Sequence, residues 1–186
     1  STAIECAEAG LKVIVLESQR IGWGASGRSG GQAIFGFGCD QHNITSMLGI
    51  EDSRRLFDFS LEGLRLIQER CSKYAIQCDW RPGHAHVAIK PRHIAELKYW
   101  QADLENNFSY STRWWEKEKL KEQLATDRYI GALYDEHSGH LHPLKYTLGL
   151  ARAALSLGVK IFEGSEVLAL QRGAKPVFKT RHGQVQ

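Results

Sequence analysis

The chain has 186 residues, of which 42% are hydrophobic and 24% are charged, with a formal net charge of +3. This length and composition are typical of a soluble globular protein with one domain, or one domain plus part of a second. The basic residues are scattered rather than gathered in a stripe, which argues against a nucleic-acid-binding protein. The apolar runs have the length of strands, far below the ~20 residues of a membrane span.

The first predicted elements are a helix, a glycine and a buried strand. Small apolar residues recur at helical spacing over residues 1–9, and Gly10 follows where a left-handed helix cap would stand. The run Val13-Ile14-Val15-Leu16 is typical of a strand covered on both faces of a parallel sheet. A loop rich in glycine then extends over residues 22–38, and loops of this length in compact domains are usually functional or disordered. This loop holds few residues typical of disorder and several apolar ones.

The middle of the chain predicts helices and short antiparallel strands. An apolar stripe indicates a helix over 50–74. The pair Pro82-Gly83 indicates the turn of a hairpin over 78–90. Further helices are expected over 91–107 and 115–124, and a strand over 130–134.

The last third repeats the opening pattern. Pro143 begins a helix, Gly158 ends it, and a strand follows over 159–162, with further strands over 167–170 and 177–180. Helix, glycine and buried strand therefore occur twice, which predicts a doubly wound α/β fold. Because the chain opens within a helix without Met and closes in an unfinished hairpin, we expect it to be an interior fragment of a longer protein.

Glu17 stands at the end of the first predicted strand. In dinucleotide-binding folds a carboxylate at this place accepts hydrogen bonds from the adenosine ribose, and the preceding helix directs its N-terminus at the pyrophosphate. If the glycine-rich turn of such a fold ended just before Ser1, Glu17 would lie ~20 residues beyond its first glycine, as the fingerprint requires. Taken alone, Glu17 is more simply explained as a solvated carboxylate at the end of a strand.

The loop after Glu17 favours a flavin over a nicotinamide cofactor. In the run from Gly22 to Gln32, small residues permit close approach of a ligand, backbone amides and the Ser26 hydroxyl can donate to phosphate oxygens, and Arg28 adds a cation. A nicotinamide-binding domain does not require such a long loop at this place. A nicotinamide-dependent dehydrogenase and a non-catalytic remnant stay open as alternatives.

The run L-E-S-Q-R-I-G-W-G-A-S-G-R-S-G-G-Q, residues 16–32, closely resembles the D-amino-acid oxidase-like family of FAD-dependent oxidoreductases. Within that family it looks most like the bacterial gamma-glutamylputrescine oxidase group. The segment G-H-L-H-P-L-K-Y, residues 139–146, and the helix-glycine-strand unit ending near Val167 resemble the same group.

This resemblance implies FAD as cofactor and a small-molecule amine or amino acid as substrate, with hydride transfer to flavin N5. It implies binding of the adenosine moiety by Glu17 (ribose), Arg20 (nearby) and Val167 (adenine, through its backbone). It also implies contacts of Ser26, Gly27 and Arg28 with the pyrophosphate and ribityl region, and of Gly31 and Gln32 with the flavin ring. It names no catalytic acid or base within this chain.

The implied organisation is a partial Rossmann-like FAD-binding domain over 1–74 and 136–186. The start of a mixed, largely antiparallel substrate domain is expected over 75–135. Because the flanking parts of the family's fold lie outside the chain, we expect this fragment to be inactive and to bind FAD weakly alone.

Several residues suggest other chemistry without supporting it. His137, His140 and His142 have close spacing but lack a fourth ligand, so we expect a turn there and no metal. Trp80 and the pair at 114–115 are expected to pack rather than to bind substrate. Nothing in the spacing argues for covalent flavin attachment at Cys39. The four cysteines form no C-x-x-C pair, which indicates the free, reduced thiols of a cytoplasmic protein.

Overall fold

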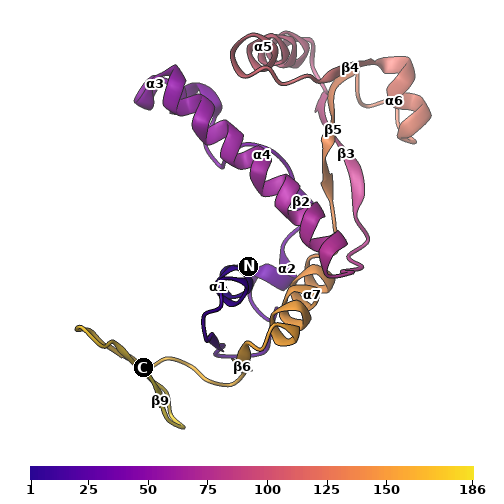
Figure 1. The fold of residues 1–186 in the computed structure, drawn as a ribbon. Helices are drawn as coiled ribbons and strands as arrows, with labels where there is room; N and C mark the ends of the chain where they lie inside the picture. Colours follow the sequence, from indigo (N-terminus) through magenta and orange to yellow (C-terminus); the bar gives the residue numbers. More distant parts are fainter. The chain divides into compact units, whose positions relative to one another are not determined.

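The computed structural model describes all residues from 1 to 186 and divides into two compact units (Figure 1). Unit 1 consists of Ser1–Gly31, Glu69–Asp79 and His142–Gln186, and unit 2 of Gln32–Gln68 and Trp80–Leu141. The assignment of 1–74 and 136–186 to an FAD-binding domain, with an insert at 75–135, stays a prediction.

Unit 1 contains the parallel strands and the helices that cover them. Its elements are α1 (Thr2–Glu8), β1 (Ile14–Leu16), α2 (Ala25–Arg28), α7 (Pro143–Ser156), β6 (Lys160–Phe162), β7 (Ala169–Gln171), β8 (Val177–Lys179) and β9 (Gln184–Val185). The last turn of α4 (Ile50–Lys73) also belongs to this unit.

Strands β1 and β6 pair in parallel, with Val15 opposite Ile161. Each strand follows a helix and a glycine with positive φ, +82° at Gly10 and +83° at Gly158. A parallel pair needs a crossover connection, so this pairing confirms the predicted α/β fold. Helices α1 and α7 pack on the pair through buried Ile4, Ala153 and Ala154, together with Val159.

The end of unit 1 is a three-stranded antiparallel sheet in the order β7-β8-β9. The strands expected over 167–170 and 177–180 are present with slightly shifted bounds. The C-terminal hairpin pairs Phe178 with Val185 and Lys179 with Gln184.

Unit 2 is built on an antiparallel sheet, as the largely antiparallel prediction requires. Its elements are β2 (Gln32–Ala33), α3 (Gln41–Leu48), most of α4, β3 (Arg81–Ala88), α5 (Pro91–Phe108), β4 (Arg113–Glu116), α6 (Lys117–Gln123) and β5 (Gly131–His140). Strand β5 is central and pairs with β3, β2 and β4.

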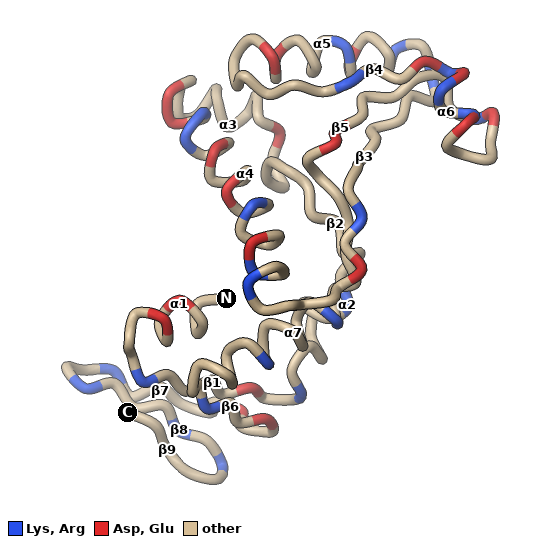
Figure 2. Tube along the Cα trace, turned by 45° about the vertical axis from the view of Figure 1, so that its right-hand side comes forward, with Lys and Arg blue, Asp and Glu red and all other residues tan.

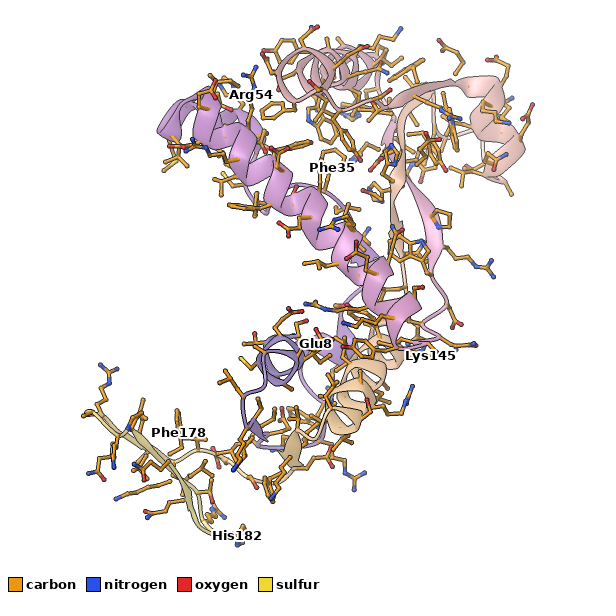
Figure 3. All side chains as sticks on the ribbon, viewed as in Figure 1. Glu8, Phe35, Arg54, Lys145, Phe178 and His182 are labelled. Atoms are coloured by element: carbon orange, nitrogen blue, oxygen red, sulfur yellow. The ribbon has the colours of Figure 1, made fainter.

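The core of unit 2 is aromatic. Phe57 of α4 and Leu104 of α5 are buried with Tyr110 and Leu133. Phe35, labelled in Figure 3, lies 4.7 Å from the Tyr110 ring and 5.5 Å from the Phe57 ring, measured between centroids. Figure 2 shows acidic and basic residues alternating along α4. Exposed pairs such as Arg55–Asp52 form there at i,i+3 spacing.

The expected hairpin over 78–90 is wrong. Residues 81–88 form one continuous strand, β3, whose partner is the distant β5. The register shifts between Pro82 and His84, and Gly83 has a φ of +100°. A Cβ atom on Gly83 would lie 2.4 Å from the Tyr134 hydroxyl oxygen, so Pro82-Gly83 marks a bulge with close packing rather than a turn.

The helix expected over 115–124 is wrong at its start. Trp115 lies in β4 and the helix α6 begins at Lys117. Trp114 covers Gly131 of β5, where an added Cβ would lie 2.5 Å from the indole ring, so packing against β5 determines the extended conformation. The strand expected over 130–134 extends to His140, and α2 and α3 were not expected. No helix in the chain combines the length and hydrophobicity that crossing a bilayer requires.

Candidate functional site

Glu17 continues the β1 ladder one step beyond the strand. Its N–H donates to the carbonyl of Phe162 at 2.9 Å, and its carbonyl accepts from the Ser165 N–H at 2.8 Å. These bonds fix the residue at the carboxyl end of a parallel pair, where open α/β sheets bind their ligands.

The Glu17 carboxylate is half-exposed and partly engaged. Oε1 accepts from the Gln19 N–H at 2.9 Å and from the Ser18 hydroxyl at 3.3 Å. Oε2 has no partner in the chain. The side chain is therefore oriented by its neighbours while one oxygen can still accept a hydroxyl proton.

The loop after Glu17 is tied to the segment after β6. The Ile21 N–H donates to Glu163 Oε1 at 2.7 Å, and the Gly164 N–H donates to the carbonyl of Gln19 at 2.9 Å. Two segments far apart in sequence thus hold the same loop, which orders its backbone without a ligand.

The glycines of this loop fall into two groups. A Cβ on Gly22, where φ is +79°, would lie 2.6 Å from the Leu144 side chain, and one on Gly27 would lie 2.0 Å from the carbonyl oxygen of Gly22. These two glycines are explained by the packing of the loop itself. Gly24 and Gly30 have no heavy atom within 4 Å of an added Cβ, so the backbone there is open to a ligand.

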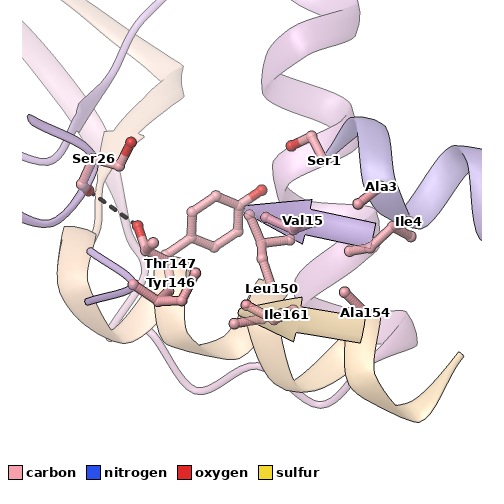
Figure 4. Close-up of a pocket in the computed structure, with 12 residues that line it drawn as sticks. Ser1, Ala3, Ile4, Val15, Ser26, Tyr146, Thr147, Leu150, Ala154 and Ile161 are labelled. Carbon is pink, nitrogen blue, oxygen red and sulfur yellow. Dashed lines mark hydrogen bonds between the residues drawn. The ribbon is translucent and has the colours of Figure 1, made fainter. Parts of the chain in front are cut away.

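Ser26 joins the loop to α7 and lines a cavity of about 450 Å³. Its carbonyl accepts from Thr147 Oγ1 at 3.0 Å, the dashed line in Figure 4, while its own hydroxyl has no partner in the chain. The Tyr146 ring also projects from α7 into this cavity (Figure 4). Apolar walls come from α1, β1, α7 and β6, at Ile4, Val15, Leu150 and Ile161 among others.

Arg70, near the end of α4, donates to Ser1, which lines this cavity. Its side chain is only 14% exposed and donates to Glu5 Oε1 at 2.7 Å and to Ser1 Oγ at 3.1 Å. The hydrogen bond to Glu5 raises the pKa of Arg70, against the effect of burial. Burial raises the pKa of Tyr146, and the Arg70 guanidinium beside its hydroxyl acts in the opposite direction. Both groups therefore keep their usual charge at neutral pH.

The end of α4 is further fixed on α1 by Glu8, labelled in Figure 3. Glu8 accepts from Lys73 and from the Tyr74 hydroxyl. These contacts, like those of Arg70, join residues far apart in sequence, so reasoning from local patterns missed them. Tyr146 could be found from the sequence, because it is the last residue of the segment 139–146 that resembles the gamma-glutamylputrescine oxidase group.

The other residues predicted for the loop differ in exposure and position. The Arg28 guanidinium lies 4.6 Å from the centroid of the Trp23 ring and has no ion pair. Arg20 is exposed. Gly31 is buried with a φ of +71°, and Gln32 lies in β2 of unit 2, opposite His140.

Val167 lines a second cavity of unit 1, of about 390 Å³, together with Leu16, Phe178 and other residues. Its side chain is 41% exposed, and its backbone N–H and carbonyl have no hydrogen-bond partner in the chain. Both groups are thus free to recognise the edge of a base.

The three histidines do not share a turn. His137 and His140 lie in β5, because that strand extends further than expected, and His142 precedes α7 and accepts from the Lys145 N–H at 3.4 Å. No group of three or more His, Cys, Asp or Glu side chains is arranged to hold a metal ion.

The open groups of unit 1 fit a dinucleotide. The Glu17 carboxylate, the Ser26 hydroxyl, the Arg28 guanidinium and the unobstructed backbone at Gly24 and Gly30 all belong to the segment that follows β1. Carboxylates bind ribose hydroxyls, and amides and guanidinium groups bind phosphates.

The FAD dependent oxidoreductase family, DAO, matches residues 1–186. The chain belongs to this family. The predictions of the family and of FAD as its cofactor are therefore confirmed, and the nicotinamide alternative is set aside.

Two relatives extend this result. The chain is 49% identical over 171 residues to a "Probable oxidoreductase OrdL" of Haemophilus influenzae, covering 90% of this chain and 39% of the relative. It is 37% identical over 185 residues to the "Gamma-glutamylputrescine oxidoreductase" of Escherichia coli, covering 100% and 43%. The chain thus spans less than half the length of these relatives.

Solved structures share the fold over the same fraction. An L-amino acid deaminase from Proteus vulgaris matches with a TM-score of 0.78 and 26% identity, covering 100% of this chain and 47% of that one. Glycine oxidase from Bacillus cereus matches with a TM-score of 0.73 and 21% identity, covering 98% and 48%. The predicted fold class is confirmed.

Proposed function

We propose that the full-length protein oxidises the C–N bond of a small amine or amino acid, with FAD as its cofactor. The observation that carries this proposal is the free oxygen of Glu17 beside an open glycine-rich loop, in a chain that belongs to an FAD-dependent family. The names of the relatives, which refer to gamma-glutamylputrescine and L-amino acids, support the substrate class.

In this proposal unit 1 binds the adenosine half of the cofactor. Glu17 accepts hydrogen bonds from the ribose, Val167 contacts adenine through its unpaired backbone groups, and Arg20 lies near the adenosine. The carboxylate is well placed for this because the Gln19 N–H already orients it.

The loop binds the central part of the cofactor. The Ser26 hydroxyl, the backbone at Gly27 and the Arg28 guanidinium contact the pyrophosphate and ribityl region. Gly31 and Gln32, which follow directly along the chain, approach the flavin ring.

FAD would supply the hydride acceptor, flavin N5, while the protein positions the substrate and excludes water. The imine product would then hydrolyse to a carbonyl compound and an amine or ammonia. The substrate-side groups that complete this chemistry are expected outside the chain. The four cysteines are all free thiols, and on this ground we propose a cytoplasmic location.

The test uses the full-length protein purified without added cofactor. We expect bound flavin with visible absorbance, which an amine such as a gamma-glutamylated diamine, or an L-amino acid, bleaches under anaerobic conditions. Glycerol 3-phosphate, which has no C–N bond, serves as the negative control and should leave the absorbance unchanged. Bleaching by the phosphate ester but by no amine would contradict the proposed reaction.

A further inference from the structure

Two cysteines of unit 1 lie in contact. Cys71 is in the last turn of α4 and Cys78 follows that helix, and their Sγ atoms are 3.4 Å apart. Cys78 is 2% exposed and Cys71 is half-buried, so one member of the pair can be reached from solvent.

The backbone holds the pair in this position. The chain reverses after α4, where the Ile76 N–H donates to the carbonyl of Cys71 at 2.8 Å and Ala75 has a φ of +50°. The carbonyl of Cys78 accepts from the His142 N–H at 2.7 Å, and the next residue, Asp79, pairs with Lys145 of α7 at 2.5 Å. Both sulfurs are therefore set by ordered segments rather than by a loose loop.

We propose that Cys71 and Cys78 form a reversible disulfide when the protein meets hydrogen peroxide. The Cys71 thiolate attacks a peroxide oxygen, the O–O bond breaks, and a sulfenic acid and one water result. The Cys78 thiol then attacks the sulfenic sulfur, the S–S bond forms and a second water leaves. The two thiols lose two electrons and two protons, and the peroxide is reduced to two waters.

The burial of Cys71 makes the first step of this reaction slow. Burial raises the pKa of Cys71 to about 12, so little thiolate is present at neutral pH. The reaction should therefore accelerate as the pH rises, and a small uncharged oxidant should act faster than a bulky disulfide. The bond would join the last turn of α4, which carries Arg70, to the segment that follows this helix. Arg70 donates a hydrogen bond to Ser1, which lines the cavity beside Ser26.

The other two cysteines of the chain provide controls. Cys39 is exposed and Cys6 is half-buried, and neither lies in contact with another cysteine. The full-length protein carrying Cys6→Ser and Cys39→Ser isolates the pair within this chain. In the unsubstituted protein, oxidation of the exposed Cys39 reports that the oxidant has acted.

The experiment treats this variant with hydrogen peroxide, blocks free thiols with N-ethylmaleimide and digests the protein with trypsin without reduction. Trypsin cleaves after Arg70, Lys73 and Arg92 but not after Arg81 or Lys90, because proline follows each. The disulfide therefore links peptide 71–73 to peptide 74–92, and the linked species is two hydrogens lighter than their sum.

We expect this linked peptide to accumulate with time and to disappear after dithiothreitol. Adding Cys78→Ser should abolish it and leave Cys71 as an oxidised or alkylated thiol. Recovery of both cysteines as maleimide adducts, or as separate sulfinic acids, would overturn the proposal if Cys39 of the unsubstituted protein is oxidised in the same time. Because the oxidant is added, this result does not depend on the proposed function.

Discussion

The guanidinium of Arg28 stacks over the indole ring of Trp23, with 4.6 Å between the guanidinium carbon and the ring centroid. Trp23 is 54% exposed, so this contact lies at the surface and is not part of the packing of the core. Stacking holds one face of the guanidinium and leaves the N–H groups at its edge free. We therefore propose that this contact prepares Arg28 to bind a phosphate.

Replacing Trp23 should weaken FAD binding without harming the fold. A cation–π contact at an exposed site contributes about 0.5–1 kcal/mol, which is about a two- to fivefold change in Kd. We expect this loss for Trp23→Ala and a smaller one for Trp23→Phe, measured by titrating the full-length apoprotein with FAD. Arg28→Ala should have the larger effect. Equal Kd values for Trp23→Ala and the unsubstituted protein would show that the stacking has no role in binding.

Gly27→Ala should disrupt the loop, because the new Cβ would lie 2.0 Å from the carbonyl oxygen of Gly22. Overpacking of this kind costs about 1–3 kcal/mol, since backbone must move. Gly24→Ala is the matched control, with no heavy atom within 4 Å of its Cβ. Thermal unfolding of the full-length protein should show a lower Tm for Gly27→Ala alone. A similar Tm for both variants would mean that the close approach of Gly27 to the Gly22 carbonyl does not constrain the loop.

Acid should destabilise unit 2 through His84 and His86. Their rings lie 4.6 Å apart between centroids, His86 contacts Trp100, and burial lowers the pKa of each, while nearby Asp135 opposes this shift. The unfolded chain, with a pKa of 6.5, then binds more protons than the folded chain. Their contribution to stability is present above pH 6.5 and is lost as the pH falls through the folded-state values.

Denaturant unfolding at a series of pH values checks this. The free energy of unfolding should fall as the pH drops below 6.5. His86→Gln should reduce the slope of this free energy against pH. An unchanged slope in both His84→Gln and His86→Gln would place the acid sensitivity elsewhere.

Tyr110→Phe should destabilise unit 2 by leaving a buried carboxylate short of a donor. Asp135 is 1% exposed and accepts from the Tyr110 hydroxyl at 2.7 Å and from the backbone N–H groups of His137 and Ser138 at 2.9 and 3.1 Å. Loss of a hydrogen bond to a charged group costs about 1.5–3 kcal/mol. Urea unfolding measures this. Tyr129→Phe, at a half-buried tyrosine outside this network, is the control, and an equal effect of both substitutions would argue against a special role of the Tyr110 hydroxyl.

How far the sequence predicts this fold depends on the range of the interactions. The two helix-glycine-strand units were predictable because Gly10 and Gly158 end helices by a local conformational requirement, and the apolar runs follow directly. The local pattern predicts a hairpin where the structure has strand β3, because Pro82-Gly83 is a typical turn signal and the partner strand β5 lies far along the chain.

The candidate site divides in the same way. Glu17 and the loop were predictable from the order of residues in one short segment. The position of Arg70 was not predictable, because its hydrogen bonds go to Ser1 and Glu5, which are close to it only in the folded chain. The same holds for buried Asp135, whose local sequence resembles an exposed polar turn.

The most direct test of the account is the affinity of the full-length apoprotein for FAD when Glu17 is replaced. Glu17→Ala removes the oxygen proposed for the ribose and should raise the Kd for FAD by about 10-fold or more, since hydrogen bonds to charged groups contribute about 1.5–3 kcal/mol. Glu17→Gln keeps an acceptor for the Gln19 N–H and should preserve the Tm while still weakening binding. An unchanged Kd for FAD in both variants would contradict the assignment of this site.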